Sequence, residues 1–210
     1  MISILIADDH AMFRDGLRRI LEAEPGLKVL AEVSDVGEMI QRAREHRPDV
    51  VLLDLEMPGG GGLEGLEDLK KWDPSVRVLV LTAHPEDQYA VRCLKSGADG
   101  YLTKDETSES LIEAISKLYR GGKHVSLRLA EKLVLQLSGE AEAAPHETLS
   151  GRELQVLCLL GSGKSVSDIA RKLCLSARTV STYRSRILEK MNLSSTEGII
   201  RYTLAEGLIT

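Results

Sequence analysis

The sequence lacks the features that mark secreted, membrane-spanning and disulfide-rich proteins. Only 3% of its 210 residues are aromatic, and no apolar stretch approaches the roughly 20 residues that cross a bilayer as a helix. The apolar run at residues 2–7 stops at two aspartates and is too short for a signal peptide. Three cysteines without CxxC spacing favour reduced core residues over a metal or disulfide framework: Cys93, Cys158 and Cys174. We therefore expect a cytoplasmic protein without membrane contacts.

Charge is distributed unevenly along the chain, whose net charge is −5. Residues 1–121 carry 15 Lys and Arg against 23 Asp and Glu, whereas residues 148–210 carry 9 against 5. An acidic segment joined to a basic one is typical of a protein whose basic end binds a polyanion. The length suits one large domain or two of about 100 residues each.

Short apolar runs alternate with helical periodicity over residues 1–121. The runs are rich in Val, Ile and Leu, as buried parallel strands are, and cover residues 2–7, 27–33, 50–53, 76–81 and 100–102. The segments between them predict helices at residues 12–23, 37–46, 63–71, 87–96 and 108–119. Five βα units in a row predict a flavodoxin-like, doubly wound α/β domain.

Two further segments follow this domain. Residues 122–147 predict a linker with a helix at 128–137 and an exposed stretch from Ser138 to Pro145. Residues 148–210 predict an all-α domain of four short helices, the first opened by a capping box at Ser150 and Glu153 and the last stopped by Gly207. The second opens at Ser165, and the third covers residues 177–191. The short break at residues 174–176 between the second and third helices predicts a helix-turn-helix.

Polar side chains stand where the predicted strands end. Asp8 and Asp9 follow the first strand, Asp54 the third and Lys104 the fifth, while Thr82 ends the fourth. Because the carboxyl ends of parallel strands meet at one edge of a sheet, these side chains should gather there. Carboxylate oxygens suit Mg²⁺ or Mn²⁺. An aspartate beside such a metal can attack a phosphoryl group and hold it as an acyl phosphate.

Each of these residues also has an ordinary structural explanation. A single Asp at a strand end is usually a helix cap or a turn residue, Thr82 is a typical strand residue, and a lone Lys is usually a solvated surface charge. Four such positions at one edge, in the right strand order, favour a shared site. A Gly-Ser-Gly-Lys-Ser run at residues 161–165 resembles the end of a P-loop, but Cys158 stands where its first glycine belongs, so we predict a turn between helices.

Residues 1–121 resemble a response-regulator receiver domain. The matching segments are Ala7-Asp8-Asp9-His10, residues 52–58 (Leu-Leu-Asp-Leu-Glu-Met-Pro), Leu81-Thr82-Ala83 and residues 100–105 (Gly-Tyr-Leu-Thr-Lys-Asp). The resemblance implies that Asp54 accepts phosphate from a sensor histidine kinase. It also implies that Lys104 contacts the phosphoryl group, that Thr82 and Tyr101 form a switch pair, and that a metal ion is bound by Asp9, Asp54, the backbone carbonyl of Glu56 and, through water, Asp8.

Two departures from the receiver pattern bear on the site. Asp105 follows Lys104 where many receivers have Pro, so no cis bond is expected there. The glycine run at residues 59–62 should make the loop after Pro58 mobile. As a hypothesis, Glu56 and His84, each two residues beyond a site residue, flank the path of the water that hydrolyses the acyl phosphate.

The third helix of residues 148–210 presents polar and basic residues on its outward side. Taken alone, this face is better explained as a solvated helix surface, but the positive charge of the segment and the tight turn before the helix favour DNA. Here the sequence resembles a LuxR-type DNA-binding domain, on the segments 149–153, 169–173, 179–180, 190–191 and 207–209. Contacts to bases or backbone are expected from Arg178, Thr179, Ser181, Thr182, Tyr183, Ser185, Arg186 and Lys190.

The two resemblances together place the chain among NarL/FixJ-type response regulators. They imply a receiver domain at residues 1–121, a linker at 122–147 and a LuxR-type domain at 148–210. They also imply promoter DNA and a histidine kinase as partners and a homodimer when phosphorylated, with RNA polymerase as a further candidate. The protein would be no enzyme beyond its own phosphotransfer and slow autodephosphorylation. Two other functions remain open, an aspartyl-phosphate phosphatase and a phosphorylation-gated module that binds protein or RNA.

Overall fold

The structure is a computed structural model, and it describes residues 1–58, 61–137 and 144–209. The chain divides into two compact units, Met1–Glu140 and Ala141–Thr210, which are described separately. Two of the residues in the glycine run predicted to be mobile, Gly59 and Gly60, lie outside the described residues, as does most of the predicted exposed stretch (138–143). Among the residues described, no helix is long and apolar enough to cross a membrane.

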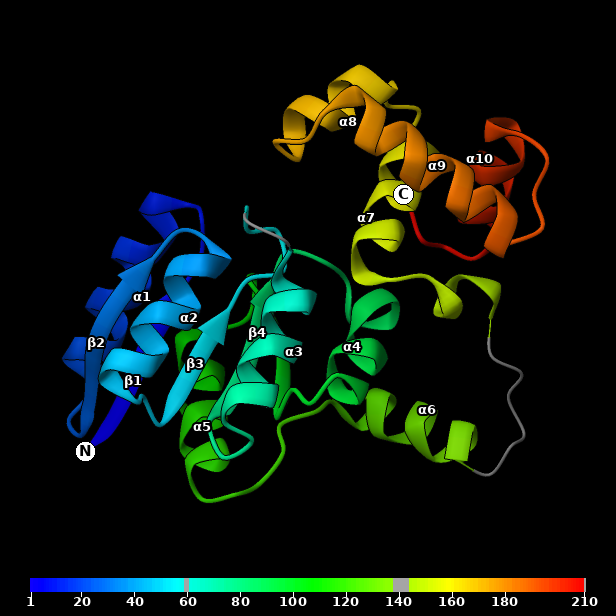
Figure 1. Cartoon of the computed structure of the whole chain (residues 1–210). Coiled ribbons are helices and arrows are strands. Elements are labelled where there is room, and N and C mark those ends of the chain that lie inside the picture. Colours follow the sequence, from blue (N-terminus) through cyan, green and yellow to red (C-terminus); the bar gives the residue numbers. More distant parts are fainter. Residues whose placement is uncertain (59–60, 138–143, 210) are drawn as a thin grey trace. The chain divides into compact units, whose positions relative to one another are not determined.

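The first unit is built on a five-stranded parallel sheet with the strand order β2-β1-β3-β4-β5. Its strands are β1 (Ile2–Ala7), β2 (Leu27–Val33), β3 (Val50–Leu53), β4 (Arg77–Thr82) and β5 (Gly100–Thr103). The helices between them are α1 (Ala11–Ala23), α2 (Val36–His46), α3 (Gly62–Trp72), α4 (Glu86–Lys95) and α5 (Ser108–Tyr119) (Figure 1). The predicted doubly wound α/β fold is confirmed, with element ends displaced by one residue at most.

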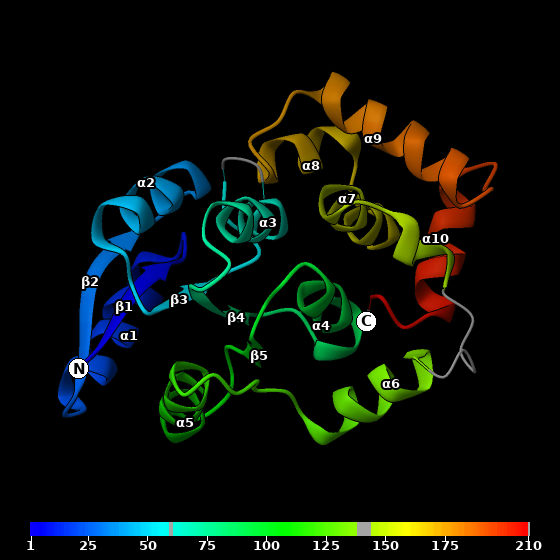
Figure 2. The same cartoon turned by 60° about the horizontal axis from the view of Figure 1, so that its bottom comes forward.

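Helices cover both faces of the sheet, which explains why its strands are continuously apolar. On one face, α1 and α5 pack on alternate strand residues in a cluster that includes Leu21, Leu52, Leu79 and Ile115, each at most 1% exposed. On the other face lie α2 and α3 (Figure 2). All four residues of β3 are buried, as expected for a central parallel strand. The carboxyl ends of β1 and β3 are therefore neighbours, held on a rigid core.

A buried carboxylate holds the opposite, amino-terminal edge of the sheet. Asp99, 2% exposed, stands just before β5 and accepts hydrogen bonds from Lys70 Nζ (2.7 Å), Arg77 Nη1 (3.1 Å) and the backbone N–H of Val78 (3.0 Å). Burial alone would raise the pKa of Asp99, but its hydrogen bonds, from Lys70 first, lower it. The network ties α3 and β4 to the start of β5, and it does not touch the acidic residues at the other edge.

A sixth helix, α6 (Leu127–Leu137), belongs to the first unit. It begins one residue earlier than the sequence predicts and packs against α4 (Figures 1 and 2). Leu129 is 2% exposed, whereas Leu127 and Val134 are exposed. The predicted linker thus contains a helix that rests on the sheet domain.

The second unit contains a short 3-10 helix, η1 (Pro145–Thr148), and four α-helices: α7 (Gly151–Gly161), α8 (Val166–Lys172), α9 (Ala177–Lys190) and α10 (Thr196–Ala205). The predicted capping box is present, because Ser150 Oγ accepts from Glu153 N and Glu153 Oε2 accepts from Ser150 N. Gly207, predicted as a cap, has φ +64° just after α10. The end of the P-loop-like run is a turn between α7 and α8, as predicted.

Candidate functional site

Three carboxylates gather at the carboxyl edge of the sheet, as the strand ends predict. Asp8 and Asp54 are each 2% exposed, and Asp9 is the more accessible of the three. The backbone places them, since Asp54 N–H donates to Ala7 O (2.9 Å) and thereby continues the pairing of β1 and β3. Ligand atoms of Asp8, Asp9, His10 and Asp54 all lie within 4.8 Å of one another.

Lys104 neutralises part of this charge. Its Nζ lies 2.7 Å from Asp8 Oδ2 and 2.7 Å from Asp54 Oδ2, and it stands 4.7 Å from the centre of the Phe13 ring. The backbone N–H of Lys104 donates to Thr82 O (2.8 Å), which fixes the start of the loop after β5 beside β4. Burial by itself would lower the pKa of Lys104, but the hydrogen bonds to Asp54 and Asp8 raise it. The ammonium therefore stays charged at neutral pH.

The remaining negative charge suits a divalent cation. Burial raises the pKa of Asp9, and the nearby carboxylates of Asp54 and Asp8 raise it further against the opposing effects of His10 and Lys104. His10 Nδ1 lies 2.7 Å from Asp9 Oδ1, and one lysine does not offset three carboxylates. An oxygen-rich cluster with uncompensated charge is the donor set that Mg²⁺ prefers. The carboxylates of Asp8, Asp9 and Asp54 therefore fit that ion.

Thr82 and Tyr101, the predicted switch pair, are both buried beside the cluster and both contact the backbone of His84. Thr82 Oγ1 accepts from His84 N–H at 3.4 Å, and the Tyr101 hydroxyl donates to His84 O at 2.9 Å. Burial raises the pKa of Tyr101, so its hydroxyl remains a donor at any physiological pH. The backbone of one residue therefore links the two side chains.

Glu56 and His84, the two residues of the hydrolysis hypothesis, contact each other. His84 Nε2 lies 3.5 Å from Glu56 Oε1, and the His84 ring stacks on Tyr89 with ring centres 4.3 Å apart. The loop that holds Glu56 is shaped by Asp54, whose Oδ1 accepts from Glu56 N–H (3.3 Å). The backbone of Glu56 is therefore bonded to the Asp54 carboxylate, and the Glu56 side chain contacts His84.

A glycine lets this loop pass close to α3. A Cβ atom at Gly62 would lie 2.3 Å from Asp54 O and 2.6 Å from Leu55 Cα, so only glycine fits without displacing the backbone of the loop. Gly62 N–H donates to Leu55 O (3.1 Å) and locks the two segments together. The last glycine of the run therefore has a packing role.

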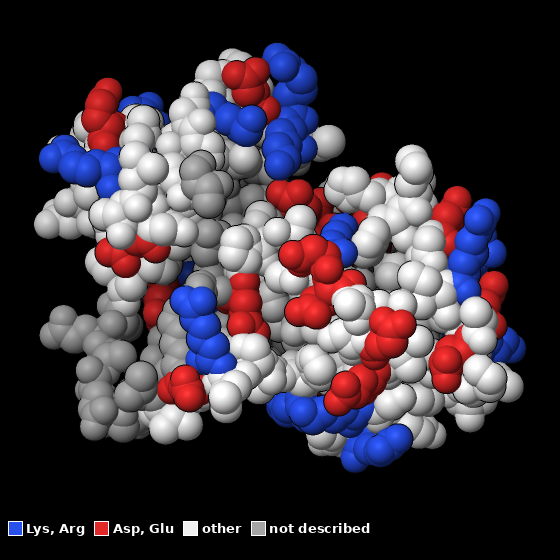
Figure 3. Space-filling view, turned by 180° about the vertical axis from the view of Figure 1, so that it is seen from behind, with Lys and Arg blue, Asp and Glu red and all other residues white. Residues whose placement is uncertain are grey.

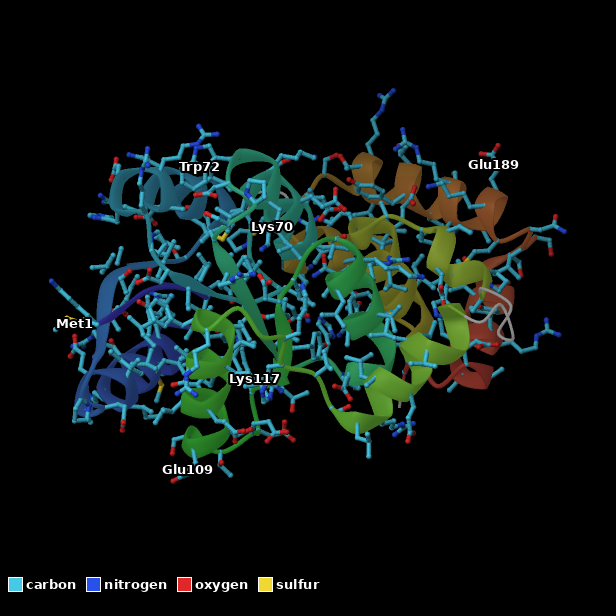
Figure 4. The ribbon with its side chains drawn as sticks, turned by 90° about the horizontal axis from the view of Figure 1, so that it is seen from below. Met1, Lys70, Trp72, Glu109, Lys117 and Glu189 are labelled. Carbon is cyan, nitrogen blue, oxygen red and sulfur yellow. The ribbon has the colours of Figure 1, made fainter. Side chains whose placement is uncertain are left out.

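The predicted DNA-contacting face of α9 is open to solvent. Its inward side is formed by Val180, Ile187 and Met191, while the exposed or half-exposed residues include all eight predicted contacts: Arg178, Thr179, Ser181, Thr182, Tyr183, Ser185, Arg186 and Lys190. Ser176 caps the helix by accepting from Thr179 N–H (3.0 Å). Glu189 also points outward from α9 (Figure 4). Acidic side chains gather on the first unit (Figure 3), in keeping with the charge difference between the two ends of the chain.

Lys190 has a partner within the second unit. Its Nζ donates to Glu153 Oε2 at 2.6 Å, and the Glu153 side chain is 4% exposed. Burial would raise the pKa of Glu153, but the hydrogen bonds from Lys190 and Ser150 lower it. The capping residue of α7 therefore also anchors the end of α9, a role for Lys190 that the sequence did not suggest.

Three neighbours of the acidic cluster were given no role by sequence reasoning. Besides His10, they are Phe13, whose ring faces Lys104, and Arg14, which donates to Asp8 O at 2.5 Å. Phe13 and Arg14 stand four and five residues beyond Asp9, on the first turn of α1. Helical spacing counted from the strand end would have placed that turn over the cluster.

Two family models match the chain. The model for the response regulator receiver domain matches residues 4–116, and the model for bacterial regulatory proteins of the luxR family matches residues 147–203. These ranges contain the acidic cluster and the exposed face of α9, respectively.

Whole-length relatives are found as well. The chain is 36% identical over 210 residues to the response regulator GacA of Pseudomonas aeruginosa, covering 100% of this chain and 98% of that protein. It is 34% identical over 209 residues to the response regulator UvrY of Escherichia coli K12, covering 99% and 96%. Among solved structures, RcsB of Salmonella enterica serovar Typhimurium, bound to the promoter P1flhDC in the presence of the phosphomimetic BeF3⁻, is similar with a TM-score of 0.60, at 26% identity and 98% coverage of both chains.

Proposed function

Because the chain belongs to the two-component response regulators that join a receiver domain to a LuxR-type DNA-binding domain, we propose that Asp54 is its phosphoacceptor and that phosphorylation there controls promoter binding by α9. The observation that carries the proposal is the environment of Asp54, a buried carboxylate flanked by two others and bonded to Lys104. We place the domain limits where the sequence predicts them, with the receiver at residues 1–121, the linker at 122–147 and the DNA-binding domain at 148–210.

The chemistry follows from the side chains around Asp54. A carboxylate oxygen of Asp54 attacks the phosphorus of a phosphohistidine in a sensor kinase, the P–N bond breaks, and the histidine nitrogen keeps the electron pair and takes up a proton. Lys104 and the hydroxyl of Thr82 then stabilise the phosphoryl oxygens. Asp9, Asp54, the carbonyl of Glu56 and, through water, Asp8 would hold Mg²⁺ or Mn²⁺. When bound, the ion offsets the negative charge of the carboxylates and of the incoming phosphoryl group.

The acyl phosphate is removed by hydrolysis, and Glu56 and His84 determine how fast this happens. Glu56 and His84 line the approach of the attacking water, and their contact at 3.5 Å narrows it. Catalysis by this chain is confined to its own phosphorylation and dephosphorylation. We expect Glu56→Ala and His84→Ala each to change the dephosphorylation rate; equal rates in both variants and the wild type would refute this assignment.

On DNA, α9 is the helix that enters the major groove, preceded by the turn at residues 174–176. Ser181, Thr182 and Ser185 face the bases, while Arg178, Thr179, Tyr183 and Arg186 reach the backbone. Lys190 already bonds Glu153, so it contributes to phosphate contact mainly by fixing the end of α9. Hydroxyl groups pair with donors or acceptors alike, so this helix does not by itself define one base sequence.

The protein acts as a dimer on two half-sites when phosphorylated, since joining two modest basic domains raises the apparent affinity. The similar RcsB is bound to promoter DNA in the presence of a phosphomimetic, which supports promoter binding by the phosphorylated form of this chain. A protein that binds promoters in this way acts in the cytoplasm, and RNA polymerase is a further partner.

The proposal is tested by labelling with acetyl phosphate and Mg²⁺, read by intact mass. The wild type should gain one phosphoryl group, and Asp54→Ala should gain none. Asp105→Ala is the matched control, because Asp105 is an exposed carboxylate next to Lys104 in sequence, and this variant should label like the wild type. Labelling of Asp54→Ala at the wild-type level would overturn the assignment.

A further inference from the structure

A closed ring of contacts joins the switch residue Tyr101 to the linker in front of α6. Tyr101 contributes two bonds to the ring. Its hydroxyl donates to His84 O (2.9 Å), and its backbone N–H donates to His124 O (3.1 Å). Tyr101, which shares the backbone of His84 with Thr82, is therefore bonded directly to the linker.

The linker joins the sheet at this point. His124 N–H donates to Asp99 O (3.0 Å), and Gly100 and His124 form a parallel bridge beside β5. A Cβ atom at Gly100 would lie 3.0 Å from His124 O and 3.1 Å from its side chain, so the glycine permits this close approach. The outer edge of β5 is thus covered by the chain's own linker.

Ser126 closes the ring on the other side. Its Oγ donates to Glu86 Oε2 (2.6 Å) and accepts from Leu129 N–H (3.0 Å). One hydroxyl therefore caps α6 and ties it to the first residue of α4, two residues beyond His84. The packing of α6 on α4, with Leu129 buried, completes the contact (Figure 1).

Thr82 connects this ring to the acidic cluster. In this structure Thr82 Oγ1 accepts from His84 N–H (3.4 Å). A Thr82 hydroxyl that turns toward a phosphoryl group on Asp54 gives up that bond, which removes one of the contacts that hold the segment from His84 to Glu86, while the bond from Tyr101 to His84 O remains. A cavity of about 450 Å³ lies beside the ring, lined among others by Glu86, Tyr101, His124 and Ser126, and it provides room for their movement.

We propose that the bond between Glu86 and Ser126 is a latch that holds α6 on α4, and that phosphorylation of Asp54 opens it. The signal leaves the receiver through α6, which is the first element of the path to the DNA-binding domain. The inference rests on the proposed phosphorylation of Asp54, and it adds the element that responds and the two residues that hold it.

Hydrogen exchange of the α6 amides, read by mass spectrometry on the full chain, tests the latch. Beryllium fluoride with Mg²⁺ serves as the phosphoryl mimic. Loss of one hydrogen bond and weakening of a helix cap predict roughly three- to tenfold faster exchange at residues 127–131. Acetyl phosphate labelling of the same preparation shows whether a negative result concerns the latch or the phosphorylation of Asp54 itself. Labelling with unchanged α6 exchange overturns the latch alone, whereas no labelling of the wild type overturns the proposed function and the latch with it.

Two variants test the latch without any phosphoryl group. Ser126→Asp keeps a capping side chain but places a carboxylate against Glu86, and Glu86→Ala removes the acceptor while the Ser126 cap remains. Both should show the faster α6 exchange constitutively and still accept phosphate. Glu109→Ala is the matched control, because Glu109 lies in the first turn of α5, bonded to a serine and pointing away from the protein (Figure 4). Wild-type α6 exchange in both Ser126→Asp and Glu86→Ala would refute the latch.

Discussion

Replacing Gly62 by Ala adds one methyl group at the most crowded backbone position beside the phosphoacceptor. The new carbon would lie 2.3 Å from Asp54 O and 2.6 Å from Leu55 Cα. Neither atom can rotate away, because both belong to the main chain. Since Cβ atoms essentially never approach a neighbour closer than 3.0 Å, the loop and the start of α3 must separate by roughly half an ångström or more.

The size of the effect follows from that displacement. Overpacking of this kind costs about 1–3 kcal/mol of unfolding free energy. One kcal/mol lowers the melting temperature of a domain of this size by about 3–5 °C, so a fall of roughly 3–15 °C is expected. Misplacing a reacting group by about 1 Å costs on the order of 100-fold in rate, so half that shift of Asp54 predicts labelling about tenfold slower.

Thermal unfolding and the initial rate of acetyl phosphate labelling measure the two effects. Gly16→Ala is the control, because it makes the same chemical change in a helix where nothing lies within 4 Å of the new carbon. That variant should label normally and melt no lower than the wild type, since Ala is favoured over Gly in a helix by about 0.5–1 kcal/mol. A Gly62→Ala protein that melts and labels like the wild type would show that α3 does not position the Asp54 loop.

Three further predictions concern other contacts. Lys190→Met should lower the free energy of unfolding by about 1–2 kcal/mol at neutral pH, because it leaves the buried Glu153 carboxylate without its partner. Since the pKa of Glu153 is lowered in the folded protein, this loss should vanish as the pH falls through that lowered value, and a loss that does not change with pH in urea unfolding would contradict the ion pair. Mg²⁺ affinity, followed by calorimetry, should fall as the pH drops through the raised pKa of Asp9, since the ion competes with a proton there; affinity that is flat with pH would exclude Asp9 as a ligand. Gly161→Ala should destabilise the second unit by about 1–3 kcal/mol, because the new Cβ would lie 2.3 Å from Thr203 Oγ1. Adding Thr203→Ser should not relieve this clash, since the hydroxyl remains. A Gly161→Ala protein as stable as the wild type would refute the close packing.

Much of the fold was predictable because its signals are local. The apolar runs of the strands and the serine caps at Ser150, Ser165 and Ser176 are set by neighbours in sequence, and the helices begin where these caps place them. The apolar run predicts β4 one residue early, because Val76 is apolar and buried although it precedes the first ladder pair of β4. Strand ends at one edge sufficed to predict the gathering of Asp8, Asp54 and Lys104.

The unpredicted bonds outside the acidic cluster join residues that are distant in sequence. The bonds of Asp99 to Lys70, of Lys190 to Glu153 and of Ser126 to Glu86 span 29, 37 and 40 positions, and no periodicity encodes such a pair. Ser126 shows the limit most plainly. Its capping role could have been found from its place before an apolar helix, but its bond to Glu86 depends on how α6 lies on α4.

The most direct measurement of the central claim is the affinity of the full chain for its own promoter fragment, isolated by genome-wide footprinting, before and after acetyl phosphate treatment. The wild type should bind the fragment more tightly after treatment, with an affinity that falls steeply as the salt concentration rises. Asp54→Ala should bind with one unchanging affinity in both conditions. Equal binding of the treated and untreated wild type, or tightening of Asp54→Ala on treatment, would contradict the account.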